Sequence, residues 1–274
     1  MKSCPDFPLF TLCLRFTISH HVLKISIGTS GFGIGQAKYA RLFSCVEVQH
    51  TFYQPPATAT LERWRAAAPA DFEFVLKAWQ LITHDARSPT YRRLKKKLSA
   101  VEKQEAGYFR STSIVKEAWE ATLTCARALK AKTILFQCPA SFKQTKENIA
   151  NLKKFLSSID RKNKDASSLN LCWEPRGDWD LKVVKSICDE LDLWHVVDPF
   201  IAKSVTPDKV YYRLHGRNGW RYEYDDIELR ELAAMLPAAS SESTKVDIHH
   251  PYVFFNNVSM TRDALTFHAM VDAT

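Results

Sequence analysis

Residues 169–199 read LNLCWEPRGDWDLKVVKSICDELDLWHVVDP, and this stretch contains one complete unit of the fold. Two short runs rich in β-branched and aromatic residues, LNLCWEPR and LWHVVDP, enclose a segment from Leu181 to Leu191 whose apolar residues recur at helical spacing. A strand, a helix and a second strand in this order form a parallel β-α-β unit. The stretch therefore indicates a parallel sheet covered by helices.

The same alternation runs from Leu23 to the end of the chain. Helical stripes at residues 114–129, 149–159, 227–236 and 260–270 separate further β-rich runs, and Ser259 is a candidate N-cap for the last stripe. Because right-handed crossovers keep consecutive parallel strands adjacent, eight such units close on themselves. We therefore predict one TIM-type (β/α)8 barrel over residues 23–274, with parallel strands and outer helices. Its strands are expected in LKISIGTS, CVEVQHTF, FEFVLKA, KTILFQCP, LNLCWEPR, LWHVVDP, VYYRLHG and YVFFNN.

The composition fits one globular domain with a basic surface. The 274 residues are 46% hydrophobic, which is enough to build the core of a single barrel. The 38 Lys and Arg residues exceed the 30 Asp and Glu residues and give a formal net charge of +8. This excess favours an anionic partner, either a small molecule or nucleic acid, although an ordinary basic surface accounts for it equally well.

The cysteines and the N-terminal segment predict a cytoplasmic protein that does not span a membrane. The seven cysteines include no CxxC pair and are odd in number, so neither a zinc ribbon nor a fully paired disulfide framework is indicated. Residues 7–18 form an apolar run, but Arg15 interrupts it and it is too short to span a bilayer. We interpret residues 1–22 as an N-terminal extension, either an ordered arm or a partly disordered segment.

A long basic connection follows the third predicted strand. Residues 87–107 read RSPTYRRLKKKLSAVEKQEAG, which exceeds the usual length of a connection between a strand and a helix. A phosphate-binding segment is one interpretation. A solvated helix face is favoured, because Glu102 and Glu105 follow the basic residues directly and the aromatic residues are limited to Tyr91 and Tyr108.

Polar side chains gather at the predicted C-terminal ends of the strands. Alternate residues of a strand face opposite sides, so Val46 and Val48 leave Glu47 on the other face, and Phe74 and Leu76 leave Lys77 there. The remaining strands end with Gln137, Glu174, Arg176, Asp198, Arg213, His215, Asn256 and Asn257. Burying several unpaired charges costs several kcal/mol each, so these residues indicate either a paired network or a ligand site. We expect a ligand site, because sites in this fold lie at the C-terminal rim.

The residue types at this rim favour an anionic ligand over a metal ion. The carboxylates and His215 are potential metal ligands, but three cations, Lys77, Arg176 and Arg213, compete for the carboxylates, and the sequence has no HxH or HExxH motif. We therefore predict no metal ligand and leave a divalent metal cofactor as the less favoured alternative. Arginine offers a planar fork to phosphate or carboxylate. The expected ligand-binding residues are Lys77, Gln137, Arg176, Asp198, Arg213, Asn256 and Asn257.

Four residues are candidates for proton transfer. Glu47 and Glu174 are candidate bases, and His84 and His215 are candidate acids because the ordinary pKa of histidine lies near neutrality. Phe52, Tyr53, Trp79 and Trp220 are predicted near the same opening, where they would stack on a base or sugar, although core packing is the simpler interpretation of each. The glycine-rich string IGTSGFGIG matches no phosphate-binding motif and indicates a tight turn.

At these residues the chain resembles the YecE-like barrels, catalogued as domain of unknown function seventy-two. The resemblance implies a TIM-type barrel, and the family's name states no activity. Phe32 stands where many members carry Trp, and the segment GIGQAKYARLF before the second strand is short, which indicates a short, archaeal-type variant with a more open mouth. The matching strings are IGTSGF (27–32), FSCVEVQHTFYQPP (43–56), ERWRAAAPADFEFVLKAWQLITH (62–84), LFQCPASF (135–142), WEPRGDW (173–179), VVDP (196–199), YYRLHGR (211–217), and FFNN followed by DAL (254–265). The family's recurring site positions are carried by Glu47, Lys77, Gln137, Glu174, Arg176, Asp198, Arg213, His215, Gly216, Asn256 and Asn257.

The leading functional hypothesis is an enzyme that acts on a phosphate-bearing ligand, either a nucleotide or nucleic acid. Lys77, Arg176 and Arg213 would bind the anion, and phosphodiester hydrolysis is one form that the reaction would take. Two alternatives stay open. The first is a non-catalytic module that binds a nucleotide or nucleic acid, and the second is a metal-dependent sugar-type isomerase or lyase.

Overall fold

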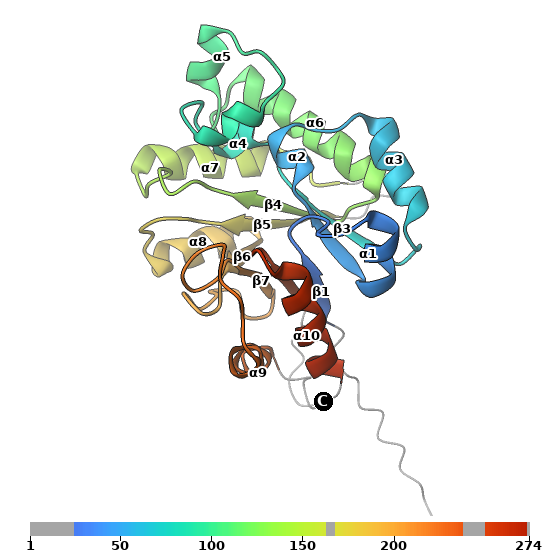
Figure 1. Ribbon diagram of the computed structural model, residues 1–274. Coiled ribbons are helices and arrows are strands. Elements are labelled where there is room, and N and C mark those ends of the chain that lie inside the picture. The colour runs from blue at the N-terminus through green and yellow to red at the C-terminus, as the bar shows by residue number, and fades with distance from the viewer. Residues whose placement is uncertain (1–24, 163–167, 238–249, 273–274) are drawn as a thin grey trace, which may run out of the picture.

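The computed structural model describes residues 25–162, 168–237 and 250–272. Eight parallel strands form one sheet in the order β1-β8-β7-β6-β5-β4-β3-β2, with helices around the outside (Figure 1). The two edges of the sheet meet where Ser30 forms a parallel bridge with Glu47 and the Gly31 N–H donates to the Glu47 carbonyl at 2.8 Å. The predicted TIM-type (β/α)8 architecture is confirmed. The predicted N-terminal extension, residues 1–22, and the two cysteines in it lie outside the described residues.

Each strand lies inside one of the runs predicted from the sequence. Their central residues are buried on both faces, as parallel strands under helices require. The strands are β1 (Ser26–Thr29), β2 (Cys45–Val48), β3 (Glu73–Lys77), β4 (Thr133–Gln137), β5 (Asn170–Glu174), β6 (Leu193–Val197), β7 (Tyr211–Leu214) and β8 (Tyr252–Phe255).

Side chains at the helix starts fix where several helices begin. The Asp180 carboxylate accepts from the Lys182 N–H at 2.7 Å and starts α8, and Asp225 and Glu228 form a capping box that starts α9. No helix among the described residues is both long and apolar enough to span a bilayer. The helices are α1 (Gln36–Leu42), α2 (His50–Tyr53), α3 (Thr58–Ala67), α4 (Gln80–Thr83), α5 (Ala100–Glu105), α6 (Ser113–Leu129), α7 (Lys146–Ser158), α8 (Leu181–Leu191), α9 (Asp226–Ala234) and α10 (Met260–Asp272), and one 3-10 helix, η1 (Pro89–Arg93), precedes α5.

The alternation of side chains along the strands divides the core into two parts. Val46, Val48, Phe74 and Leu76 belong to the large cluster that packs the strands against the helices. A second, smaller cluster consists only of strand residues and fills the barrel interior; we call it the barrel plug. It comprises Cys45, Val75, Leu135, Cys172, Trp194, Val196, Tyr211, Tyr252 and Phe254. On most strands the inward-facing residue two positions after the plug residue is polar. These polar residues lie at the C-terminal ends of the strands and form the candidate site.

The five described cysteines are buried, and no disulfide joins any two of them. Cys45 and Cys172 belong to the barrel plug, and burial raises the pKa of the Cys172 thiol well above its usual range. These side chains therefore serve as small core residues.

The long basic connection folds as η1 and α5 and lies on the surface. Arg92, Lys95 and Lys97 are exposed. Lys96 pairs with Glu117 at 3.2 Å and with Glu102 at 3.3 Å. These pairs and the exposure support the solvated-face interpretation.

Candidate functional site

The polar strand ends meet at the C-terminal rim of the barrel. On five strands the inward-facing residue that follows the barrel plug is polar and almost completely buried. Each is the last or next-to-last residue of its strand. They are Glu47 on β2, Lys77 on β3, Gln137 on β4, Glu174 on β5 and Arg213 on β7.

Arg213 crosses the barrel interior from β7 and is fully buried. Its Nε and Nη2 atoms each donate to a different carboxylate oxygen of Glu47 at 2.8 Å, which is a bidentate pair. Its Nη1 atom donates to Glu174 Oε2 at 2.6 Å and lies 3.3 Å from His215 Nε2. Nη2 also lies 3.5 Å from the Ser30 hydroxyl. One guanidinium therefore links three strands, and its donors are committed to protein groups.

This arrangement changes the roles that the sequence suggests for Arg213 and Glu47. Arg213 is fully buried and its guanidinium is held by Glu47 and Glu174, so it is a structural cation. Glu47 accepts from the Tyr211 hydroxyl at 2.6 Å and from the Ser30 hydroxyl at 3.1 Å in addition to the guanidinium. Burial raises the pKa of Glu47, but the Arg213 charge outweighs it and holds this pKa below its usual range. A carboxylate that is ionised and saturated in this way is a poor general base.

Glu174 faces the rim with one of its two oxygens. Oε2 is bound by Arg213, whereas Oε1 lies 3.1 Å from His215 Nε2 and accepts from Gln137 Nε2 at 3.4 Å. Arg213 and His215 outweigh the effect of burial and lower the pKa of Glu174. Glu174 is therefore ionised at neutral pH and acts as a hydrogen-bond acceptor at the rim, and its role as a base stays a prediction.

His215 is held between an amide and a carboxylate. Asn256 Nδ2 donates to His215 Nδ1 at 3.1 Å, and Nε2 points at Glu174 Oε1. With the Asn256 amide in this orientation, Nδ1 is the acceptor and Nε2 carries the proton. The His215 side chain is 18% exposed. The ring is therefore fixed at both nitrogens and keeps a partly exposed edge.

Lys77 is buried beside this network without joining it. The residue is 5% exposed, and its Nζ atom lies 3.9 Å from the centre of the Phe52 ring. Nζ makes no hydrogen bond or ion pair with any residue that the structure describes. Burial, reinforced by the charge of Arg213, lowers the pKa of Lys77 to about 7. At neutral pH the ammonium and the free amine are therefore both populated.

His84 contacts the same ring but has lost its basicity. Its ring packs edge-on against Phe52 at 4.9 Å, and Nδ1 lies 2.8 Å from the Thr83 hydroxyl. Burial, with the charges of Lys77 and Arg176, lowers the pKa of His84 to about 3. The imidazole is neutral at physiological pH, so His84 is not the proton donor that its ordinary pKa suggests.

Arg176 is the rim cation whose donors are the most available. Its side chain is 47% exposed, and its nearest carboxylate oxygen, Glu174 Oε1, lies 3.9 Å from Nε. That separation is too long for a hydrogen bond. The planar fork of Arg176 is therefore open to a ligand.

Two of the predicted ligand-binding residues have structural roles instead. Asp198 accepts from the backbone N–H groups of His215 at 2.9 Å and Phe200 at 3.1 Å, so its two oxygens fix loop backbone. Asn257 donates to the Tyr222 carbonyl at 2.8 Å and to Asp263 at 2.6 Å. Asn257 follows Asn256 directly, but its amide binds Tyr222 and Asp263 whereas that of Asn256 contacts His215.

Residues 36–274 match the family described as "Protein of unknown function DUF72". The chain belongs to this family. The UPF0759 protein YunF of Bacillus subtilis is 25% identical over 246 residues, which cover 81% of this chain and 79% of YunF. The assignment to a short, archaeal-type variant stays a prediction.

Two solved DUF72 family structures share the fold. The protein from Enterococcus faecalis superposes with a TM-score of 0.67 at 22% identity and covers 93% of this chain and 100% of its own. The protein from Thermotoga maritima gives a TM-score of 0.64 at 20% identity and covers 91% of this chain and 99% of its own. These likenesses show the DUF72 barrel fold.

Two residues of the site in this DUF72 barrel are not predicted from the sequence. Ser30, just beyond β1, and Tyr211, on β7, both donate hydroxyl groups to Glu47. Alternation along YYRLHG places Tyr211 on the same face as Arg213 and His215, so the signal for Tyr211 is present in the sequence. Ser30 has no comparable signal, because its role depends on the closure of the barrel.

Three of the aromatic residues predicted near the opening lie in different surroundings. Phe52 forms the wall shared by Lys77 and His84. Trp79 is buried against α6, where its backbone N–H donates to the Thr122 hydroxyl at 3.3 Å. Trp220 is 60% exposed. Of these three residues, only Phe52 contacts a buried charged side chain of the rim, that of Lys77.

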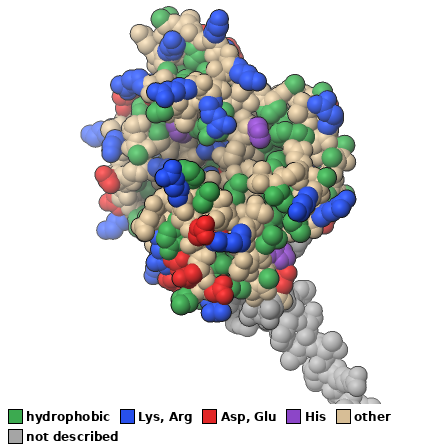
Figure 2. Space-filling view, in the orientation of Figure 1, with side chains coloured by type: hydrophobic (Ala, Val, Ile, Leu, Met, Phe, Trp, Pro, Cys, Tyr) green, Lys and Arg blue, Asp and Glu red, His purple; other side chains and the backbone are tan. Residues whose placement is uncertain are grey.

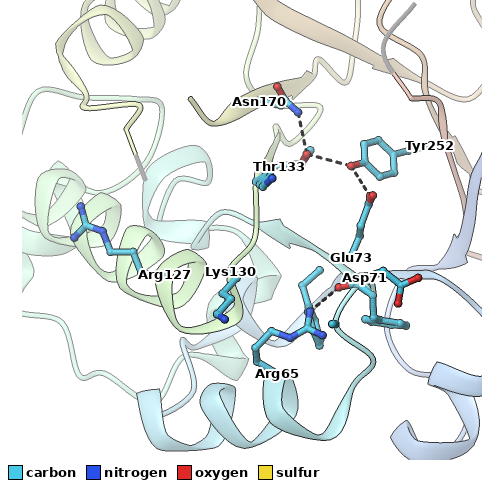
Figure 3. Close-up of a pocket in the computed structure, with 12 residues that line it drawn as sticks. Arg65, Asp71, Glu73, Arg127, Lys130, Thr133, Asn170 and Tyr252 are labelled. Carbon is cyan, nitrogen blue, oxygen red and sulfur yellow. Dashed lines mark hydrogen bonds between the residues drawn. The ribbon is translucent and has the colours of Figure 1, made fainter. Parts of the chain in front are cut away.

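A separate cavity of about 620 Å³ lies at the opposite, N-terminal end of the strands (Figure 3). Tyr252 donates to Glu73 at 2.8 Å on its lining. Arg127 and Lys130 stand at the C-terminal end of α6, where positive charges offset the helix dipole. Arg65 donates to the Phe72 carbonyl at 2.5 Å. These cations have structural explanations, and the chemistry-bearing groups lie at the other end.

Proposed function

We propose that the C-terminal rim binds a phosphate-bearing ligand and that Arg176 is its principal anion contact. The proposal rests on which of the three rim cations are already hydrogen-bonded to carboxylates. Arg213 is committed to Glu47 and Glu174, whereas Arg176 and Lys77 make no hydrogen bond to a carboxylate among the described residues. The guanidinium of Arg176 and the amine of Lys77 therefore provide the donors that a phosphate group requires.

The charge of the rim supports an anion rather than a cation as the ligand. At neutral pH the carboxylates of Glu47 and Glu174 are balanced by Arg213 and Arg176, and Lys77 adds part of a further positive charge. Figure 2 shows Lys and Arg side chains over the upper part of the face it presents, and Asp and Glu side chains gathered lower down, over the region of α9. The partial charge of Lys77 and the open guanidinium of Arg176 would attract a phosphate group to the rim.

The same geometry makes a metal-dependent isomerase or lyase the less favoured reading. The two rim carboxylates are already bridged by the Arg213 guanidinium. A divalent ion between them would have to displace that cation. Among the described residues, no three His, Cys, Asp or Glu side chains are grouped so as to hold a metal ion.

His215 supplies the group for proton transfer beside the anion. Its Nε2–H donates to Glu174 Oε1, and Asn256 fixes the ring. A phosphoryl oxygen that approaches Arg176 would come near this N–H group, because both side chains contact Glu174 Oε1. This placement supports proton donation to a phosphate ester oxygen, as hydrolysis of a phosphodiester would require.

Calorimetric titration with glycerol 3-phosphate, a nucleotide and a short oligonucleotide tests the proposal. We expect saturable binding that the Arg176→Met variant weakens by about 10- to 100-fold, or roughly 1.5–3 kcal/mol, the value of hydrogen bonds to a charged group. The control is Arg230→Met, which removes an arginine that is exposed on α9 and lies 4.0 Å from Asp226. Equal affinity in the wild type and Arg176→Met would overturn the assignment. Turnover on a panel of phosphodiesters then separates an enzyme from a binding module.

A further inference from the structure

Lys77 differs from Arg213, Glu47 and Glu174 in making no hydrogen bond or ion pair with any described residue. Arg213 is paired with both Glu47 and Glu174 through hydrogen bonds of 2.6–2.8 Å. The amine of Lys77 instead lies over the face of Phe52. The residue is 5% exposed, so a small part of its surface remains accessible.

The groups around Lys77 balance so that the free amine is accessible at neutral pH. Arg213 and Arg176 oppose its protonation, whereas Glu47 and Glu174 favour it. The neighbouring His84 is neutral, because burial lowers its pKa to about 3. Together with burial these charges bring the pKa of Lys77 to about 7. An amine that is desolvated beside other cations is the usual form of a nucleophilic lysine.

We propose that Lys77 is a nucleophile that forms a Schiff base with the carbonyl group of a phosphorylated aldehyde or ketone. The inference rests on the proposed function, because Arg176 is required to hold the phosphate group while the carbonyl carbon reaches Nζ. It narrows the ligand class to small carbonyl compounds that carry a phosphate, such as the open-chain form of a sugar phosphate.

The step balances without an oxidant or reductant. The lone pair of the neutral Nζ forms a bond to the carbonyl carbon, and one proton moves from nitrogen to the former carbonyl oxygen, which gives a carbinolamine. That hydroxyl group takes up a proton from solvent at the opening and leaves as water while the C=N bond forms. The product is a protonated imine, which keeps one positive charge on Nζ.

The rim stabilises this product. The iminium charge stays at the position of Nζ, where Glu47 and Glu174 favour a positive charge and the face of Phe52 contacts it. The barrel plug below Lys77 excludes water from one side, because Val75 precedes it on the same face of β3. Charge stabilisation and desolvation therefore act on the same atom.

Reductive trapping tests the inference directly. The protein is incubated at pH 7 with D-glyceraldehyde 3-phosphate and cyanoborohydride, which reduces the iminium to a stable secondary amine, and the modified residue is located by peptide mass spectrometry. Unphosphorylated glyceraldehyde is run in parallel. We expect Lys77 to be modified first, about tenfold faster with the phosphorylated compound, as one charge-assisted contact from Arg176 would give.

Two variants and a pH series complete the design. Lys77→Met should lose the fast adduct, and Lys182→Met, which removes an exposed lysine of α8, should keep it. In the wild-type protein the rate at Lys77 should reach half its maximum near pH 7, whereas exposed lysines should rise toward pH ~10. This pH series needs no variant and stands even where Lys77→Met does not fold.

The outcomes separate the two proposals. Lack of preferential modification at Lys77 with either aldehyde overturns the Schiff base, whatever the protein binds. Modification of Lys77 at equal rates with and without phosphate, together with no binding of glycerol 3-phosphate, keeps the nucleophile and overturns the anion site. Binding of glycerol 3-phosphate with no adduct at Lys77 keeps the anion site and overturns the nucleophile.

Discussion

The guanidinium of Arg213 holds both carboxylate oxygens of Glu47 across the interior of the barrel, each at 2.8 Å. These two residues lie 166 positions apart in the chain. Their pair fixes β7 against β2, and the third contact, to Glu174, adds β5. The floor of the rim is therefore a rigid ionic network, and the groups that remain available to a ligand are those around it.

Arg213→Met should strongly destabilise the protein. The substitution strands two buried carboxylates, which costs about 3–5 kcal/mol for a buried pair that loses one partner. Urea melts measure the change in the free energy of unfolding. The matched control is Arg176→Met, whose side chain is half exposed and should change stability by no more than about 0.5 kcal/mol. Near-wild-type stability of Arg213→Met would show that the network does not hold the barrel together.

Stability should rise with pH between about 7 and 10 because of Lys77. Its pKa is about 7 in the folded protein and near 10.4 in an unfolded chain, so the unfolded state binds more protons in this window. The sign is therefore a gain of stability as pH rises, with a slope of at most about 1.4 kcal/mol per pH unit for one group. Urea melts of the wild type and Lys77→Met across this range should differ by that slope. If the free energy of unfolding depended on pH equally in the two proteins, the pKa of Lys77 would not be lowered in the folded state.

The acid side of the stability profile should carry a dependence of the same sign, with stability again rising as pH rises. The pKa values of Glu47 and Glu174 are lowered in the folded state, so their contribution is present above the unfolded value of about 4.3 and is lost as pH falls through the folded values. Arg213→Met should flatten this acid transition, because Arg213 is what lowers both values. An acid transition of the same steepness in this variant would contradict the assignment.

The basic surface connection should be dispensable for binding. Exchange of Arg92, Lys95 and Lys97 for Ser should leave the urea midpoint and the affinity for an oligonucleotide unchanged, because these side chains are solvated and lie on η1 or beside it. The dependence of affinity on salt is the sensitive readout, since each lost phosphate contact lowers the slope by about one unit. A reduced slope would identify the segment as a nucleic-acid contact.

The sequence predicts the barrel because its signals are local. Short apolar runs, helical stripes and alternation need only neighbouring residues, and alternation also identifies Glu47 and Lys77 as inward-facing. All eight strands fall inside the predicted runs for this reason.

The roles of the site residues depend on contacts that the sequence does not specify. The partner of Arg213 comes from the other side of the barrel, so its guanidinium could not be distinguished from a free anion contact. The low pKa of His84 follows from burial and from neighbours on other elements. Asn256 and Asn257 are adjacent in the sequence, and only the folded chain gives them different partners, His215 for the first and Asp263 for the second.

The most direct test of the central claim is the proton balance when glycerol 3-phosphate binds at pH 7. A phosphate group held at the rim should raise the pKa of Lys77, so binding should draw protons from the buffer. Calorimetry in two buffers of different ionisation enthalpy measures this uptake, and the comparison with Lys77→Met removes the contribution of the phosphate itself. We predict that the wild type takes up more protons on binding than Lys77→Met does. Equal uptake in the two proteins, or no saturable binding to the wild type, would contradict the account.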